Sequence, residues 1–155
     1  MPELKVGSKA PQIALDTDSG ERFKLSAQKG KNVVVFFYPK ASTPGCTKEA
    51  CAFNESLPKI EAANTVVVGI SPDPVKAIAK FKEKYGLKFA LLADVERQAA
   101  EAYGVWAEKS LYGRKYMGVE RTTFLVGADG RIAHIFPKVK VEGHAAEVLA
   151  ALRAL

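Results

Sequence analysis

Two short runs of apolar residues stand out in the hydropathy pattern of the chain. Residues 33–38 read VVVFFY and residues 65–70 read TVVVGI. Both runs are rich in β-branched residues and neither alternates with polar positions, which is typical of strands covered on both faces. The first run stops at Pro39, which cannot donate to a sheet ladder. The pattern therefore predicts two central strands of a buried sheet.

A helix is predicted after the second run. The sequence SPDP at 71–74 is a strong start signal, because Asp73 can cap a helix and Pro74 fits its first turn. Apolar residues at helical spacing follow as far as Gly86, a residue type that commonly ends helices.

The remaining pattern indicates an α/β chain. We expect an N-terminal hairpin at 12–25, a short strand at 89–92, a short helix at 96–103, a long polar loop at 106–120, a hairpin at 122–136 and a terminal amphipathic helix at 143–155. From the strand at 33–38 onward, the order β-α-β-α-β-β-α is the thioredoxin-like pattern. We therefore expect one domain over residues 1–155, with a central mixed sheet flanked by helices and an N-terminal hairpin extension.

Composition and charge exclude several classes of function. The chain is 48% hydrophobic and 26% charged, as is ordinary for a globular protein. It has no apolar run near the length of a membrane span and no export signal, so we expect a soluble, cytoplasmic protein. The net charge is +6, but basic residues are interleaved with acids and no basic-aromatic motif accompanies them. We therefore expect no nucleic-acid partner and no membrane partner.

The two cysteines of the chain, Cys46 and Cys51, lie in the stretch TPGCTKEAC at 43–51. In a chain without an export signal, such a pair favours a catalytic, metal or redox role over a disulfide framework. Thr43 can cap a helix and Pro44 suits its first position. Cys46 would then lie in the first turn, where free backbone N–H groups and the helix dipole favour a thiolate.

Cys46 also begins an apolar helix face. The positions four, seven, eleven and fourteen residues beyond it are Ala50, Phe53, Leu57 and Ile60. Cys46 should therefore face inward at the carboxyl edge of the sheet, where open α/β sheets place their binding crevices. The plainer alternative is a small buried hydrophobe. A strand ended by proline, a loop and a cysteine in a proline-started turn together argue against packing alone.

Cys51 lies five residues beyond Cys46, roughly 140° around an ideal helix and about 7.5 Å along it. The two Cα atoms would be about 8 to 9 Å apart, beyond the roughly 7 Å limit for a disulfide. If the cysteines pair, the first turns of the helix must unwind. Alternatively, Cys51 is only a small residue on the opposite face.

A metal site would need distant His134 and His144 to converge on these thiols, and CxxxxC is not standard zinc spacing, so we expect none. We expect His144 at the surface, near a helix start.

The stretch PKASTPGC at 39–46 resembles the active-site signature of the peroxiredoxins: proline, three residues, Thr or Ser, two residues, cysteine. The longer string FFYPKASTPGCTKEAC is similar to the subfamily called bacterioferritin comigratory protein, or PrxQ. GISPDPVKAIAKFKEKYGLKFALLAD and YGVWAEKSLYGRKYMGVERTTFLVGADGRI are similar to it as well. The resemblance thus extends over most of the chain.

This resemblance implies a thiol-dependent peroxidase that needs no cofactor. Cys46 would attack the O–O bond of hydrogen peroxide or an organic hydroperoxide and become a sulfenic acid. Cys51 would be the resolving cysteine that forms an intramolecular disulfide with Cys46. Thioredoxin or a similar thiol reductant would then restore both thiols by exchange. The subfamily is often monomeric, which implies a monomer here.

The resemblance also assigns roles around the sulfur. Thr43 would hydrogen-bond beside the sulfur and the peroxide oxygens, while Pro39 and Gly45 would belong to the substrate pocket. Arg121 would stabilise the thiolate and the departing oxygen. Peroxide reduction needs an ionised sulfur, a nearby cation and donors aimed at growing oxygen charge, and these residue types meet that need.

Two other functions fit the same cysteines, namely a general thiol–disulfide oxidoreductase and a redox-regulated chaperone. The oxidoreductases typically have CxxC and a cis-proline just before the strand that corresponds to TTFLV. This chain has CxxxxC, and residues 120–122 contain no proline. The peroxidase is therefore the favoured hypothesis.

Overall fold

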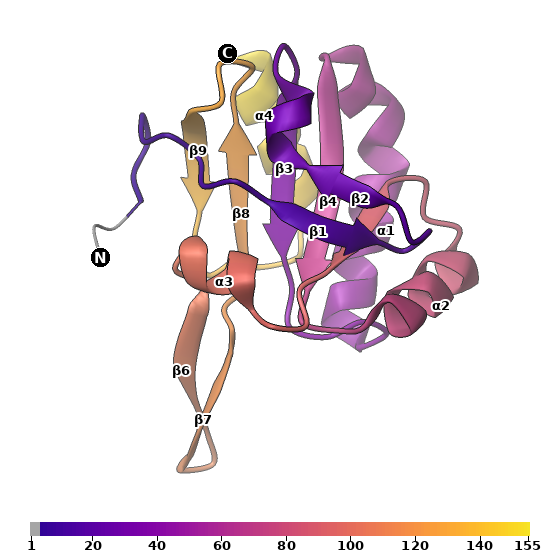
Figure 1. Ribbon diagram of the computed structural model, residues 1–155, viewed down its shortest axis with the longest axis vertical. Coiled ribbons are helices and arrows are strands. Elements are labelled where there is room, and N and C mark those ends of the chain that lie inside the picture. Colours follow the sequence, from indigo (N-terminus) through magenta and orange to yellow (C-terminus); the bar gives the residue numbers. More distant parts are fainter. Residues whose placement is uncertain (1–3) are drawn as a thin grey trace.

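A seven-stranded mixed sheet forms the centre of the computed structural model, which describes residues 4–155 (Figure 1). In spatial order its strands are β2 (Arg22–Lys24), β1 (Ala14–Thr17), β5 (Ala90–Ala93), β4 (Thr65–Ser71), β3 (Asn32–Phe37), β8 (Thr122–Val126) and β9 (Ile132–Phe136). β3, β4 and β5 are parallel, whereas the other neighbours pair antiparallel. The predicted mixed sheet and N-terminal hairpin are confirmed.

The two central strands are buried on both faces, as their unbroken apolar runs predict. In β3, Val34 and Phe36 point into one apolar cluster, and Val33, Val35 and Phe37 point into the other. All five are at most 1% exposed. This alternation of buried side chains fixes the register of β3, because a shift of one residue would exchange its two faces.

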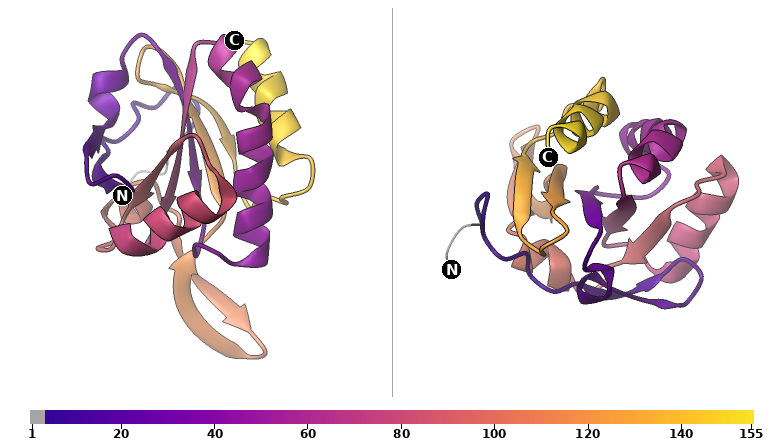
Figure 2. Two further views of the ribbon diagram at one scale, coloured as in Figure 1. Left: turned by 90° about the vertical axis from the view of Figure 1, so that its right-hand side faces the viewer. Right: turned by 90° about the horizontal axis from the view of Figure 1, so that it is seen from above.

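Helices cover these clusters from opposite sides (Figure 2). The helices are α1 (Pro44–Ala62), α2 (Val75–Tyr85), α3 (Gln98–Ala102) and α4 (His144–Arg153), with a 3₁₀ turn η1 (Leu25–Gln28). α1, α2 and α4 pack on the face that contains Phe36, and α3 packs on the other with the N-terminal hairpin. No helix within residues 4–155 combines the length and the apolar composition that a membrane span requires.

The prediction of a polar loop at 106–120 is wrong. Most of this segment forms a hairpin of β6 (Trp106–Leu111) and β7 (Arg114–Val119), closed by Tyr112 and Gly113 with φ of +51° and +75°. Positive φ at both turn residues suits a tight hairpin. The strands are largely polar and exposed, so they show little of the alternation of apolar and polar residues that identifies a half-buried strand. Hydrogen bonds between the two backbones define them instead.

The predicted cap of α2 is also wrong, because Pro74 is the N-cap and Asp73 does not cap the helix. The Asp73 carboxylate instead accepts hydrogen bonds from the backbone N–H of Ala41 at 2.7 Å and from the Ser71 hydroxyl at 2.8 Å. Ala41 lies 32 residues earlier in the chain, beyond the reach of a local capping rule. Asp73 thus ties the loop between β3 and α1 to the end of β4.

Candidate active site

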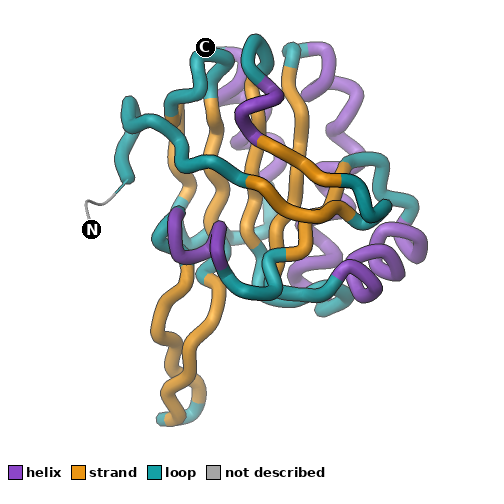
Figure 3. Tube along the Cα trace, viewed as in Figure 1, coloured by secondary structure: helices purple, strands orange, loops and turns teal. Residues whose placement is uncertain are grey.

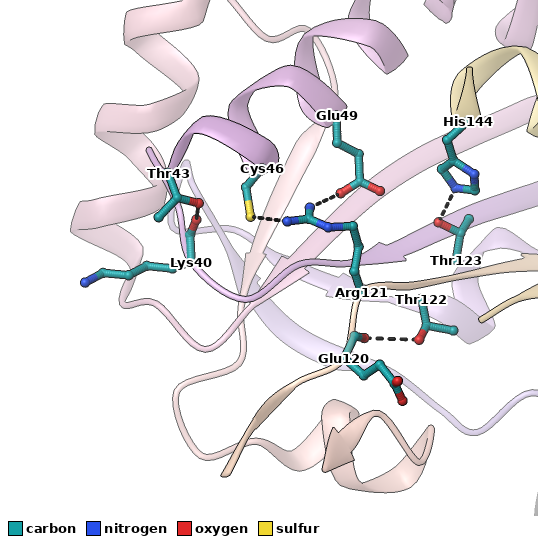
Figure 4. A network of polar contacts seen from close by, with 9 residues as sticks. All are labelled: Lys40, Thr43, Cys46, Glu49, Glu120, Arg121, Thr122, Thr123 and His144. Atoms are coloured by element: carbon teal, nitrogen blue, oxygen red, sulfur yellow. Dashed lines mark hydrogen bonds and ion pairs between the residues drawn. The ribbon is translucent and has the colours of Figure 1, made fainter. Parts of the chain in front are cut away.

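The loop after β3 and the first turn of α1 present Cys46 at the carboxyl end of the central strands. Thr43 is the N-cap with extended backbone and Pro44 is the first helical residue, as predicted. The Thr43 hydroxyl does not cap the helix, however; it donates to the Lys40 carbonyl at 2.8 Å (Figure 4). Cys46 is 1% exposed and faces the apolar cluster, which confirms its predicted inward orientation.

Arg121 joins the sulfur to a carboxylate. It directly precedes β8, whose first residue Thr122 pairs with Phe37 at the end of β3. Its Nη2 donates to Cys46 Sγ at 3.3 Å, and its Nη1 donates to Glu49 Oε1 at 2.7 Å (Figure 4). The planar guanidinium therefore holds two acceptors at once, which a point charge such as an ammonium could not do with fixed geometry.

Glu49 is the part of this site that the sequence reasoning missed. It is 1% exposed, and burial raises its pKa to about 7 although the charge of Arg121 opposes this rise. Its second oxygen has no hydrogen-bond partner within residues 4–155. The available signal was its position three residues after Cys46, which places a carboxylate on the otherwise apolar inward face of the helix.

Gly45 and Pro39 border the site. A Cβ at Gly45 would lie 3.2 Å from Arg121 Nη2, so the guanidinium packs against backbone that has no side chain in the way. Pro39 lies two residues after the end of β3 and is half-buried at the start of the loop that leads to α1. Both residues therefore lie in the segment that shapes the approach to Cys46.

Cys51 is not brought to Cys46. Both thiols are free, and they lie on one uninterrupted helix from Pro44 to Ala62. Cys51 is partly exposed, and its pKa is raised by burial and then by the nearby charge of Glu55. The folded helix thus keeps the two sulfurs on different faces, as the five-residue spacing predicts.

The prediction that His144 lies at the surface is wrong. It is 2% exposed at the start of α4, where its ring shares hydrogen bonds with Thr123 at 2.8 Å and Glu147 at 2.9 Å. Burial lowers its pKa, although Glu147 opposes the shift. The rings of Phe53 and Phe136 pack edge-on against it. Packing of α4 onto the sheet buries the ring, and the local sequence near a helix start does not reveal this.

The chemistry of the assembled site follows from its charges. A buried thiol lies in the first turn of a long helix, and a guanidinium contacts its sulfur. Both features stabilise negative charge at this position, whether the charge lies on the sulfur or on an oxygen atom bound next to the sulfur. Within residues 4–155, no three His, Cys, Asp or Glu side chains gather as a set of metal ligands.

Comparisons with known proteins agree with this chemistry. Residues 6–135 match the model of the AhpC/TSA family. The chain is 51% identical to a putative peroxiredoxin bcp of Coxiella burnetii, over 96% of this chain and 99% of the relative. It is 47% identical to peroxiredoxin Bcp of Bacillus subtilis, over 97% and 96%. A solved structure of the Xanthomonas campestris bacterioferritin comigratory protein, from work on its alkyl peroxide reduction activity, has a TM-score of 0.90 and 39% identity, covering 97% of this chain and 96% of that one.

The fold therefore has close counterparts in proteins of one kind. The match at a TM-score of 0.90 confirms the thioredoxin-like fold, and the identities confirm the resemblance seen in the active-site stretch. The chain belongs to the AhpC/TSA family and is a peroxiredoxin of the bacterioferritin comigratory protein, or PrxQ, subfamily.

Proposed function

We propose that the protein reduces hydrogen peroxide and organic hydroperoxides through a Cys46 sulfenic acid, that Cys51 resolves this acid as an intramolecular disulfide, and that thioredoxin or a similar dithiol restores both thiols. The observation that carries the proposal is the Arg121 guanidinium, 3.3 Å from Cys46 Sγ and paired with Glu49. One chain supplies both cysteines and the cation, so a monomer suffices for the cycle.

In the first step the Cys46 thiolate attacks one peroxide oxygen. An S–O bond forms, the O–O bond breaks, and the departing oxygen leaves with a proton as water or an alcohol. Sulfur is oxidised and the peroxide is reduced. Arg121 stabilises the charge that moves from sulfur to the departing oxygen.

Thr43 has a definite role in that step. Its single hydroxyl proton is donated to the Lys40 carbonyl at 2.8 Å, so its oxygen lone pairs remain to accept a hydrogen bond. A peroxide O–H can therefore be oriented by donation to Thr43. Pro39 and Gly45 line the approach on the same segment of chain.

In the second step a Cys51 thiolate attacks the Cys46 sulfenic sulfur: the S–S bond forms, the S–O bond breaks, and the hydroxide takes up a proton and leaves as water. The helical spacing of the two cysteines forbids this while the start of α1 is folded. The unwinding has a natural limit at Asn54. Its side chain donates to the Gly86 carbonyl at 3.1 Å and accepts from the Lys88 backbone N–H at 2.8 Å. These bonds fasten α1 beyond Cys51 to the chain after α2.

Peroxide consumption by two cysteine variants tests the proposal. Cys46→Ser should abolish consumption with any thiol reductant. Cys51→Ser is the matched control, because it removes one thiol from the same helix but leaves the attacking sulfur, so it should still consume about one equivalent of peroxide. Undiminished turnover by Cys46→Ser would remove Cys46 from the reaction.

A further inference from the structure

The β6–β7 hairpin stands away from the body of the protein (Figure 3). Its strands pair from Trp106↔Val119 to Leu111↔Arg114 and form a sheet of their own, with no third strand within residues 4–155. A two-stranded hairpin on its own is only marginally stable in water. This ribbon therefore adds little to the core, and its side chains need another explanation.

Large apolar side chains are concentrated on this exposed ribbon. Leu111, Tyr112, Tyr116 and Met117 are between 46% and 99% exposed, and within residues 4–155 they make up four of the seven exposed large hydrophobic residues. Several exposed apolar groups on one small polar element indicate an interaction surface. Tyrosine, methionine and arginine are also the residue types enriched in the centres of interfaces.

The register of the hairpin divides it into two faces of different charge. Directly paired residues share a face, so Lys109, Leu111, Arg114 and Tyr116 lie on one side, named here the cationic face. A Cβ at Gly118 would meet the side chains of Lys109 at 3.3 Å and Tyr116 at 3.5 Å, which confirms that these residues share that side.

The opposite face is electrically balanced. It contains Glu108, Lys115 and Met117, and the first two form an ion pair at 3.8 Å. At its root, Trp106 packs under the Arg97 guanidinium at 4.8 Å from the ring centre. The two hairpin cations that form no ion pair within residues 4–155, Lys109 and Arg114, therefore both lie on the cationic face.

The root of the hairpin lies beside the residue that contacts the reactive sulfur. Lys109 is half-buried, and its pKa is lowered by burial and by the charge of Arg121, while Glu120 and Cys46 oppose the shift. The chain itself joins the hairpin to the site, because β7 ends at Val119, two residues before Arg121, whose Nη2 lies 3.3 Å from Cys46 Sγ. A molecule that rests on the cationic face is consequently held next to the first turn of α1.

We propose that the cationic face docks the protein that reduces the Cys46–Cys51 disulfide, and that this reductant is a dithiol protein whose reactive thiol lies in an apolar surface bordered by carboxylates. The inference rests on the proposed function, because it assigns the partner of the same redox site. The exposed side chains supply apolar contact, and Arg114 and Lys109 supply charge that attracts carboxylates and orients the encounter.

A second copy of this chain fits the face less well. Two cationic faces would repel each other, and the whole chain has a net charge of +6. A stable interface needs roughly 800 Å² per partner, whereas brief redox encounters occur at the small end of the range, which suits a ribbon of two six-residue strands. Size and charge both favour a transient acidic partner.

Disulfide exchange rates in two matched double variants test the proposal. Arg114→Glu/Tyr116→Ser alters the cationic face, and Lys115→Glu/Met117→Ser makes the same changes of charge and polarity on the opposite face. Each protein is first oxidised with peroxide to the Cys46–Cys51 disulfide. Reduction is then followed with a reduced thioredoxin of net negative charge and, separately, with dithiothreitol.

The cationic-face variant should be reduced by thioredoxin about tenfold more slowly than the opposite-face variant, and the difference should shrink as salt rises to about 0.2 M. Dithiothreitol should reduce both variants at the wild-type rate. Equal slowing of the two variants, or slowing with dithiothreitol, would overturn the inference. So would a wild-type dimer in sedimentation that the cationic-face variant converts to monomer. A protein that forms no Cys46–Cys51 disulfide overturns the proposed function as well.

Discussion

Replacing Glu49 by glutamine should make the stability of the protein depend less on pH. Glutamine keeps the size and one oxygen acceptor of Glu49 but cannot ionise, so it mimics the protonated acid. In the wild type the buried carboxyl has a pKa of about 7, raised from its ordinary 4.5 by burial and only partly restrained by Arg121. The folded protein therefore binds this proton more tightly than the unfolded chain does.

The sign and size of the effect follow from that difference. The stability contributed by the protonated carboxyl is complete below pH 4.5 and is lost as the pH rises through about 7. At about 1.4 kcal/mol for each pKa unit, the total loss is about 3 kcal/mol. Between pH 5 and 8, the free energy of unfolding of the wild type minus that of Glu49→Gln should thus fall by about 2 to 3 kcal/mol.

Urea unfolding of both reduced proteins, followed by far-UV circular dichroism from pH 5 to 8, measures this difference. Glu55→Gln is the matched control, because it removes a carboxylate from the solvent-exposed side of the same helix. A fall that both variants share would not be due to burial. A Glu49→Gln difference that is constant or rises with pH would refute the reasoning. It would mean that the Arg121 pair fully offsets burial and that Glu49 is ionised throughout.

Three further outcomes follow from the site. Arg121→Lys should slow the reaction of Cys46 with peroxide about 100-fold in stopped-flow, because lysine cannot hold sulfur and Glu49 together; a change under threefold would contradict this. Cys51→Ser should keep a normal single-turnover rate but lose steady-state recycling by thioredoxin; normal recycling would mean that another molecule's thiol resolves Cys46. Oxidation should lower the far-UV helical signal and raise amide exchange over about residues 44–52. A protected, helical segment that contains the disulfide would disprove the unwinding.

The sequence predicted the fold well where burial controls it. Unbroken apolar runs marked β3 and β4, and the helix signals around Pro44 and Gly86 match the observed ends of α1 and α2. It failed at β6–β7, where backbone pairing and two residues with positive φ define the hairpin without a buried face. The pattern of hydrophobic positions does not predict a hairpin that is held by backbone pairing alone.

The candidate site was predictable only in its local part. The thiol in the first turn of α1 followed from neighbouring residues, whereas Arg121, 75 positions further on, was assigned by resemblance alone. Glu49 and His144 were missed because their burial depends on partners brought in by β8 and α4. The prediction for Asp73 failed for the same reason, since its partner Ala41 belongs to another loop. Contacts of this kind join residues that are far apart in the sequence, so they can be identified only when the three-dimensional structure is known.

Mass spectrometry of the protein after one equivalent of peroxide examines the proposed chemistry at its centre. Free thiols are blocked at once, and the peptide that contains residues 43–51 is compared with that of the reduced protein. The prediction is a Cys46–Cys51 disulfide within one chain, with the loss of two hydrogens, and a trapped Cys46 sulfenic acid in Cys51→Ser. Unmodified Cys46 beside unconsumed peroxide, or Cys46 joined only to another chain, would contradict it.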